Sequence, residues 1–260
     1  MLRALTTAAT GMEAQQTYID VTSNNLANVN TTGFKKTRAN FQDLMYQIQK
    51  APGGATSQGT ESPTGIQIGL GVRTASTQKE FATGSLKQTG NFFDMAIEGE
   101  GFLQVVLPDG GIGYTRDGAM HVDENGTLVN ASGFPLEPNI TVPQEAVNVT
   151  IGQDGVVSYQ TNDGQVVQLA QIQTTSFINP AGLLAVGGNV YRESGSSGPP
   201  IVGNPGENGF GVINQGFLEM SNVAVVEEMI HLITAQRAFE FNSKAVQASD
   251  QMLRELGKLG

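Results

Sequence analysis

The residues best suited to chemistry in this 260-residue chain are two histidines. His121 lies in an expected strand and His231 on an expected long helix, and no acidic pair flanks either one at metal-ligand spacing. Catalytic or metal-binding histidines need such partners to orient the ring and to complete the ligand set. We therefore expect both histidines to be ordinary surface or hydrogen-bonded residues.

Several short motifs match functional patterns only in part. Asp123-Glu124-Asn125-Gly126 and Asn162-Asp163-Gly164 lack the alternating carboxylates and the final Glu of a calcium loop, so they predict turns. Glu98 and Glu100 could share one face of a strand, but nothing else indicates a glycosidase cleft. Gly69-Leu70-Gly71 begins like a dinucleotide-binding loop without its third glycine or its helix. We predict no catalytic residues, no cofactor and no metal, and hence no enzyme.

The charge of the chain excludes one class of partner. The net charge is −10, and residues 1–46 carry +1 and residues 215–260 carry −2, so the middle holds −9. An acidic chain without a basic stripe is poorly suited to nucleic acid, because binding there depends on neutralising phosphates. The chain has no cysteine, which excludes disulfides and thiolate metal sites.

Hydropathy argues against a membrane role. No apolar run approaches the ~20 residues that are needed to span a bilayer. The first residues, MLRALTTAATGMEAQQ, are interrupted by Thr and Gly and then by Glu and Gln, which is not the pattern of a secretory signal. We expect no membrane insertion and no cleaved signal peptide.

Both ends of the chain are expected to be helical. Near the N-terminus, residues recur at alternating spacings of three and four, which is the pattern of a coiled-coil seam: Leu2, Leu5, Ala9, Met12, Gln16, Ile19, Ser23 and Leu26. From residue 223 to 259 the apolar positions recur at a helical period and include Val226, Ile230, Ile233, Phe241, Met252 and Leu256. The polar first helix is marginal alone and needs a partner. We expect the two helices to pair.

The region between the helices has the pattern of strands. Short β-prone runs are separated by Asp-Gly and Asn-Gly turns, which is typical of antiparallel hairpins. The predicted fold is therefore α+β and discontinuous, with coiled-coil-like terminal helices around a central barrel or sandwich-like antiparallel domain. The expected parts are residues 1–34 plus 217–260 as the helical domain, 35–75 as an extended arm or linker, 76–193 as the β domain, and 194–216 as a Gly/Pro-rich return linker.

Three stretches resemble the bacterial flagellar rod and hook family. The first is the dozen residues 24–35, which include Asn24, Asn25, Leu26, Ala27, Asn28, Thr32, Gly33 and Phe34. The second lies on the C-terminal helix, and the third covers residues 97–103 and 114–118 in the middle. Residues 47–73 are similar to an insertion that marks the distal-rod branch of that family, with Pro63, Gly65, Gly69, Gly71 and Arg73.

The resemblance implies a structural subunit that assembles into a rigid helical tube, transmits torque to the hook and encloses an export channel. The terminal helices would form the inner tube, the β domain the outer wall, and residues 47–73 an ordered arm, although composition alone favours a flexible segment there. The implied partners are further copies of the chain, hook and proximal rod proteins, P- and L-ring proteins, the rod cap and the flagellar type III export apparatus. The implied location is the basal body, where the rod crosses the periplasm.

Other functions remain open on the residues alone. A proximal rod or hook protein is the nearest alternative within the family. A wall hydrolase would need a carboxylate or metal cluster, and an adhesin would use the β domain to bind a ligand.

Overall fold

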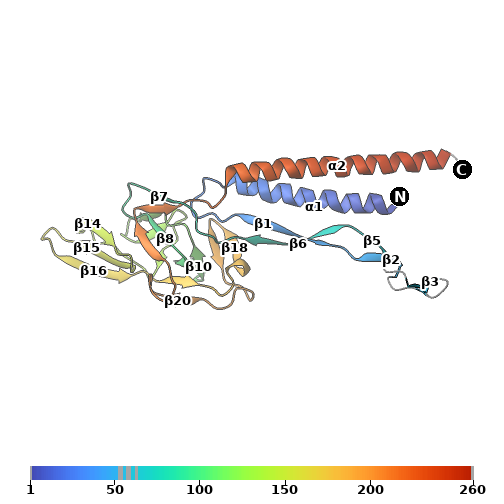
Figure 1. Cartoon of the computed structure of the whole chain (residues 1–260). Coiled ribbons are helices and arrows are strands. Elements are labelled where there is room, and N and C mark those ends of the chain that lie inside the picture. Colours follow the sequence, from blue (N-terminus) through green and yellow to red (C-terminus); the bar gives the residue numbers. More distant parts are fainter. Residues whose placement is uncertain (1, 52–54, 57–59, 62–63, 259–260) are drawn as a thin grey trace. The chain divides into compact units, whose positions relative to one another are not determined.

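The structure is a computed structural model that describes residues 2–51, 55–56, 60–61 and 64–258 (Figure 1). The chain forms two compact units. Unit 1 comprises Met1–Leu26, Thr37–Gln78 and Ala224–Gly260, and unit 2 comprises Ala27–Lys36 and Lys79–Val223. The segment that was expected as an arm therefore falls largely in the same unit as the helices, and unit 1 is discontinuous in sequence.

Two helices form the ends of unit 1. The N-terminal helix α1 spans Leu2–Ala27 and the C-terminal helix α2 spans Val225–Lys258. Glu227 and Glu228 lie in the first turn of α2, where carboxylates stabilise the positive end of the helix dipole. The terminal helices that were predicted from the apolar periodicity are thus confirmed.

The helices contact each other at three levels and run antiparallel. Asn25 of α1 donates a hydrogen bond to the Glu228 carboxylate, and the rings of Tyr18 and His231 lie edge to face. Further along, any side chain at Gly11 would meet the Asn242 side-chain amide at 2.9 Å, so Asn242 of α2 packs closely against the α1 backbone there.

The internal segment of unit 1 is a long two-stranded ribbon. Its strands β1 (Thr37–Asp43) and β6 (Val72–Lys79) pair, and further out β2 (Tyr46–Lys50) pairs antiparallel with β5 (Ile66–Gly69). The short strands β3 (Ala55–Thr56) and β4 (Thr60–Glu61) pair beyond them. The ribbon is held to α1 at Gly71, whose positive φ and lack of a side chain allow contact with Thr10.

Unit 2 is built from antiparallel strands. Its largest sheet has the order β18–β19–β10–β9–β17–β20, with strands Leu184–Gly187, Val190–Arg192, Ile112–Thr115, Phe102–Val106, Thr174–Ser176 and Ile201–Gly203, and β13 (Leu136–Glu137) also pairs with β9. A three-stranded sheet joins β14 (Asn148–Ile151), β15 (Val156–Gln160) and β16 (Val166–Gln171). Three pairs complete the unit: β8 (Met95–Glu98) with β21 (Val212–Gln215), β7 (Leu86–Gln88) with β22 (Phe217–Glu219), and β11 (Met120–Val122) with β12 (Leu128–Asn130).

The antiparallel β domain is confirmed, but the barrel alternative is wrong. The largest sheet has two different end strands, β18 and β20, so among the described residues no sheet closes on itself. The stretch 194–216, which was expected to be a linker, contains β20 and β21. A short 3₁₀ turn spans Pro180–Gly182, before this stretch.

The core of unit 2 has an aliphatic and an aromatic part. The aliphatic part includes Met95, Leu103, Val105, Met120, Leu128, Leu136, Ile140, Val157, Ile172 and Ile213. In the aromatic part, Phe102, Tyr114, Phe177 and Tyr191 pack edge to face, with Phe81 against them. This geometry is the one that aromatic rings prefer, and it places two phenol groups away from water.

Burial of Tyr191 predicts a loss of stability at alkaline pH. Desolvation raises the pKa of Tyr191 to about 12, above its ordinary value of 10.0. Between these values the unfolded chain releases the proton while the folded chain keeps it, so the free energy of unfolding falls as pH rises. We expect Tyr191→Phe to remove about 2–3 kcal/mol of this loss between pH 10 and 12.

The measurement is urea denaturation of the wild-type and variant chains at pH 9, 10, 11 and 12. Tyr159→Phe, in the half-buried middle of β15, serves as the matched control. Equal pH slopes for the wild-type and Tyr191→Phe chains would contradict the assignment.

Candidate assembly surfaces

The described residues hold no group of three or more His, Asp and Glu side chains placed to bind a metal ion. His121 is exposed on β11, and His231 is exposed on α2. Within the same residues, no helix is long and apolar enough to cross a membrane. The features that remain are structural: a polar clamp, a buried ion network, an apolar helix face and the ribbon.

Asn25 forms a clamp within unit 1. Its side chain accepts a hydrogen bond from the Thr37 backbone N–H at 2.8 Å and donates to the Thr37 carbonyl at 2.8 Å. The same amide donates to Glu228 Oε2 at 3.2 Å. We call the family-like residues 24–35 the signature. One buried residue of the signature therefore joins α1, the start of the ribbon and the first turn of α2. An amide whose hydrogen bonds are all satisfied fixes the register of these elements.

The signature residues from Ala27 onward lie in unit 2. Gly33 has a φ of +66° and donates its N–H to the Glu219 carbonyl at 2.8 Å, and a side chain there would strike the backbone at Arg116 and Asp117. Thr32 donates to the Asp117 carboxylate at 2.9 Å. Phe34 is buried, and the Lys79 ammonium lies 4.9 Å from its ring centre. Leu26 is half-buried, Asn24 and Ala27 are exposed, and Asn28 is half-buried.

Lys35, the last residue of the signature, forms a buried ion network with Arg116 and Glu219. The Lys35 Nζ lies 2.6 Å from Glu219 Oε1 and also donates to the Ala82 carbonyl at 2.7 Å. The Arg116 guanidinium lies 3.5 Å from Glu219 Oε2, an ion pair without hydrogen-bond geometry, and donates to the Gly99 carbonyl at 2.8 Å. The segment after α1, the middle of the chain and the segment before α2 therefore meet at the Glu219 carboxylate.

Because the network is buried, removing one of its charges would strongly destabilise unit 2. Desolvation lowers the pKa of Lys35, and the neighbouring Glu219 carboxylate opposes that shift. Desolvation also lowers the pKa of Arg116. Two buried cations thus depend on a single carboxylate. In the sequence, Lys35 and Arg116 stand out only as parts of family-like stretches. Glu219 does not stand out at all, because its partners lie far away in the sequence.

On α2, the side chains turned toward α1 are small or polar. Glu228, Ala235 and Ser249 are buried and Asn242 is half-buried, at intervals of seven residues along the helix. The predicted apolar positions lie on another face and are exposed: Val226 at 70%, Ile230 at 55%, Ile233 at 52%, Phe241 at 66% and Met252 at 48%. We call these five residues the apolar stripe.

The predicted positions of α1 are less exposed. Leu5, Met12, Ile19 and Leu26 are half-buried. The side chains of Leu2 and Leu256 lie outside what the structure describes. Since most of the apolar positions on both helices keep contact with water, their role in helix pairing stays a prediction.

The glycine-rich stretch belongs to the ribbon. Gly65 is half-buried, and Gly69 packs beside the Tyr46 ring. Arg73 is exposed and donates to Gln42 across the ribbon at 3.2 Å. Gly71 touches α1, as described above, and Pro63 lies outside the described residues.

The ion network predicts that Glu219→Gln destabilises unit 2 strongly. Removing the carboxylate leaves Lys35 and Arg116 buried without their counter-charge, which costs about 3–5 kcal/mol. The matched control is Glu80→Gln, since Glu80 pairs with Lys36 at 3.2 Å but both side chains are about a third exposed. The control is expected to cost at most about 1 kcal/mol.

Urea denaturation followed by near-ultraviolet circular dichroism checks this prediction. Adding Lys35→Met to Glu219→Gln removes one of the two unpaired cations, so part of the lost stability is expected to return. Similar losses for Glu219→Gln and Glu80→Gln would contradict the network.

Comparison with known proteins covers most of the chain. Residues 5–35 match the model of the flagella basal body rod protein family, residues 96–159 that of the flagellar hook protein FlgE/F/G D1 domain, and residues 214–259 that of the flagellar basal body rod FlgEFG protein C-terminal region. The first region contains most of α1, and the third leads into α2 and contains it. The second region lies in unit 2.

Whole proteins match over their full length. The flagellar basal-body rod protein FlgG of Borreliella burgdorferi is 48% identical over 256 residues, covering 97% of each chain. The FlgG proteins of Buchnera aphidicola subsp. Schizaphis graminum and Bacillus subtilis are 48% and 41% identical, and each match covers at least 99% of both chains. The chain therefore belongs to the family of the flagellar basal-body rod protein FlgG.

Proposed function

We propose that this chain is the subunit of the flagellar distal rod and that it polymerises through the apolar stripe of α2. The observation that carries the proposal is the stripe itself, because five large side chains on one helix are about half exposed or more. Leaving such surface in water forgoes roughly 25 cal/mol for each Å² that a partner could cover. Contiguous apolar faces of this kind mark protein–protein contacts.

The terminal helices of further copies of the chain are the partner that best fits the apolar stripe. The half-buried apolar positions of α1, Leu5, Met12 and Ile19, offer a surface of the same chemistry. A contact between different faces of identical copies is heterologous, and it repeats into a helical filament. Coiled-coil-like packing of the terminal helices around an export channel would follow, with unit 2 as the outer wall.

Membership of the FlgG family supports a proposal for the remaining partners and the location. We propose that the chain joins a proximal rod at one end and a hook at the other, and that it assembles under a rod cap and inside the P and L rings. We propose that the chain is exported by the flagellar type III route and that the assembled rod crosses the periplasm and transmits torque. A proximal rod or hook protein is disfavoured by the full-length matches to FlgG proteins.

The stripe predicts that Phe241→Asp prevents assembly without unfolding the subunit. Phe241 is 66% exposed, so in the monomer the substitution is expected to change stability by only about 0.5 kcal/mol. A buried carboxylate between subunits would lower the amount of assembled chain by about tenfold or more. Gln236→Asp is the matched control, because Gln236 is exposed on the same helix but off the stripe.

The measurement is the quantity of chain in basal bodies isolated from cells that express each variant in place of the wild-type chain. Normal incorporation of Phe241→Asp would contradict the proposal, as would an equal loss with Gln236→Asp.

A further inference from the structure

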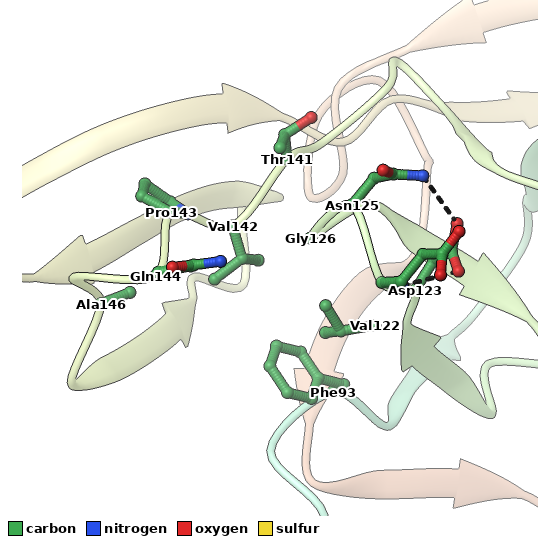
Figure 2. Close-up of a pocket in the computed structure, with 11 residues that line it drawn as sticks. Phe93, Val122, Asp123, Asn125, Gly126, Thr141, Val142, Pro143, Gln144 and Ala146 are labelled. Carbon is green, nitrogen blue, oxygen red and sulfur yellow. Dashed lines mark hydrogen bonds between the residues drawn. The ribbon is translucent and has the colours of Figure 1, made fainter.

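One hollow of unit 2 has apolar walls and an acidic rim. Its volume is about 610 Å³, and Phe93, Val122, Val142 and Pro143 provide apolar surface (Figure 2). Asp123 and Glu124 lie at the β11–β12 turn beside these walls. The Asp123 carboxylate accepts hydrogen bonds from the Glu124 N–H and the Asn125 amide, and both acidic side chains are exposed. We call this hollow the acidic pocket.

The ribbon of unit 1 carries a surface of complementary chemistry. Lys50 of β2 lies directly opposite Ile66 of β5, and Ile68 lies two positions along on the same face. All three are exposed, and no carboxylate of a described residue forms an ion pair with Lys50. A two-stranded ribbon is only marginally stable in water, so a surface that covers this face would stabilise it.

The net charge of the ribbon segment is also opposite in sign to that of unit 2. Unit 2 carries six basic and fifteen acidic residues, a net charge of −9. The ribbon segment 37–78 carries three basic and two acidic residues, a net charge of +1. A ribbon with this small positive charge is attracted to unit 2 of a neighbouring copy, whereas two copies of unit 2 repel each other.

We propose that the acidic pocket of one copy receives the Lys50 face of the ribbon of a second copy. In this contact the Lys50 ammonium pairs with the Asp123 and Glu124 carboxylates, and Ile66 and Ile68 cover the valine and phenylalanine walls. The ion pair would fix the register between copies, and the apolar contact would supply most of the affinity. This inference rests on the proposed assembly into a rod and names a second contact within it.

A charge exchange tests the contact. Glu124→Lys and Lys50→Glu each place like charges opposite one another, and each is expected to lower the amount of chain in isolated basal bodies by about tenfold. The combined variant restores opposite charges, so incorporation is expected to return to within about threefold of wild type. Urea denaturation of the purified variants verifies that each one is folded.

Two matched variants serve as controls. Asp163→Lys alters an exposed carboxylate at another turn of unit 2, and Lys87→Glu alters an exposed lysine of β7. Neither control is expected to impair assembly or to rescue a pocket variant.

The inference is overturned if Lys50→Glu assembles normally, or if the combined variant assembles no better than Glu124→Lys alone. The latter result would mean that the pocket binds some other partner. The proposed rod function fails separately, if the wild-type chain itself is missing from basal bodies.

Discussion

The contact between α1 and α2 is made of small and polar side chains, and it determines where the larger apolar side chains must lie. Gly11 allows the Asn242 amide to approach α1 closely, and Asn25 hydrogen-bonds to Glu228. Since Ala235 and Ser249 fill the buried positions of α2 between and beyond these residues, the residues of the apolar stripe lie on a different face, in water. Polar contacts of this kind fix register rather than supply affinity, so the helices gain most by further contacts.

Unit 2 differs from the helix pair, because its apolar core is buried and the chain segments next to α1 and α2 are bonded to it. The Glu219 carboxylate holds Lys35 from the segment after α1 and Arg116 from the middle of the chain. The Glu219 carbonyl also accepts the Gly33 N–H. The chain segments that lead into both terminal helices are therefore fixed within one folded unit. A subunit with a stable domain and an unsatisfied pair of helices is suited to polymerise, since assembly covers what folding leaves exposed.

Local patterns in the sequence predicted the elements well. The helical period located α1 and α2, and the Asp-Gly and Asn-Gly turns located hairpins such as β15–β16, because turn chemistry and periodicity are local properties. The sequence did not reveal which face of α2 would be buried. Apolar periodicity identifies an apolar helix face but not the surface that covers it. In the single subunit this face of α2 is exposed to solvent.

Contacts between residues that are far apart in the sequence could not be predicted from local patterns. Composition favoured flexible segments at 47–73 and 194–216, yet cross-strand pairing places parts of both in strands. The meeting of Lys35, Arg116 and Glu219 joins residues that are up to 184 positions apart, and no local pattern indicates it. The largest sheet of unit 2 ends in β18 and β20 and does not close into a barrel. This outcome depends on the order of the strands, which hairpin turns alone do not determine.

The most direct test of this account is the water accessibility of the apolar stripe before and after assembly. The natural chain has no cysteine, so Val226→Cys introduces a single thiol at a position that is 70% exposed. We expect a maleimide to label this thiol rapidly in the purified subunit and at least about tenfold more slowly in isolated basal bodies. Ala235→Cys, at a position buried against α1, should react slowly in both. Equal labelling of the Val226→Cys variant in the subunit and in the basal body would contradict the account.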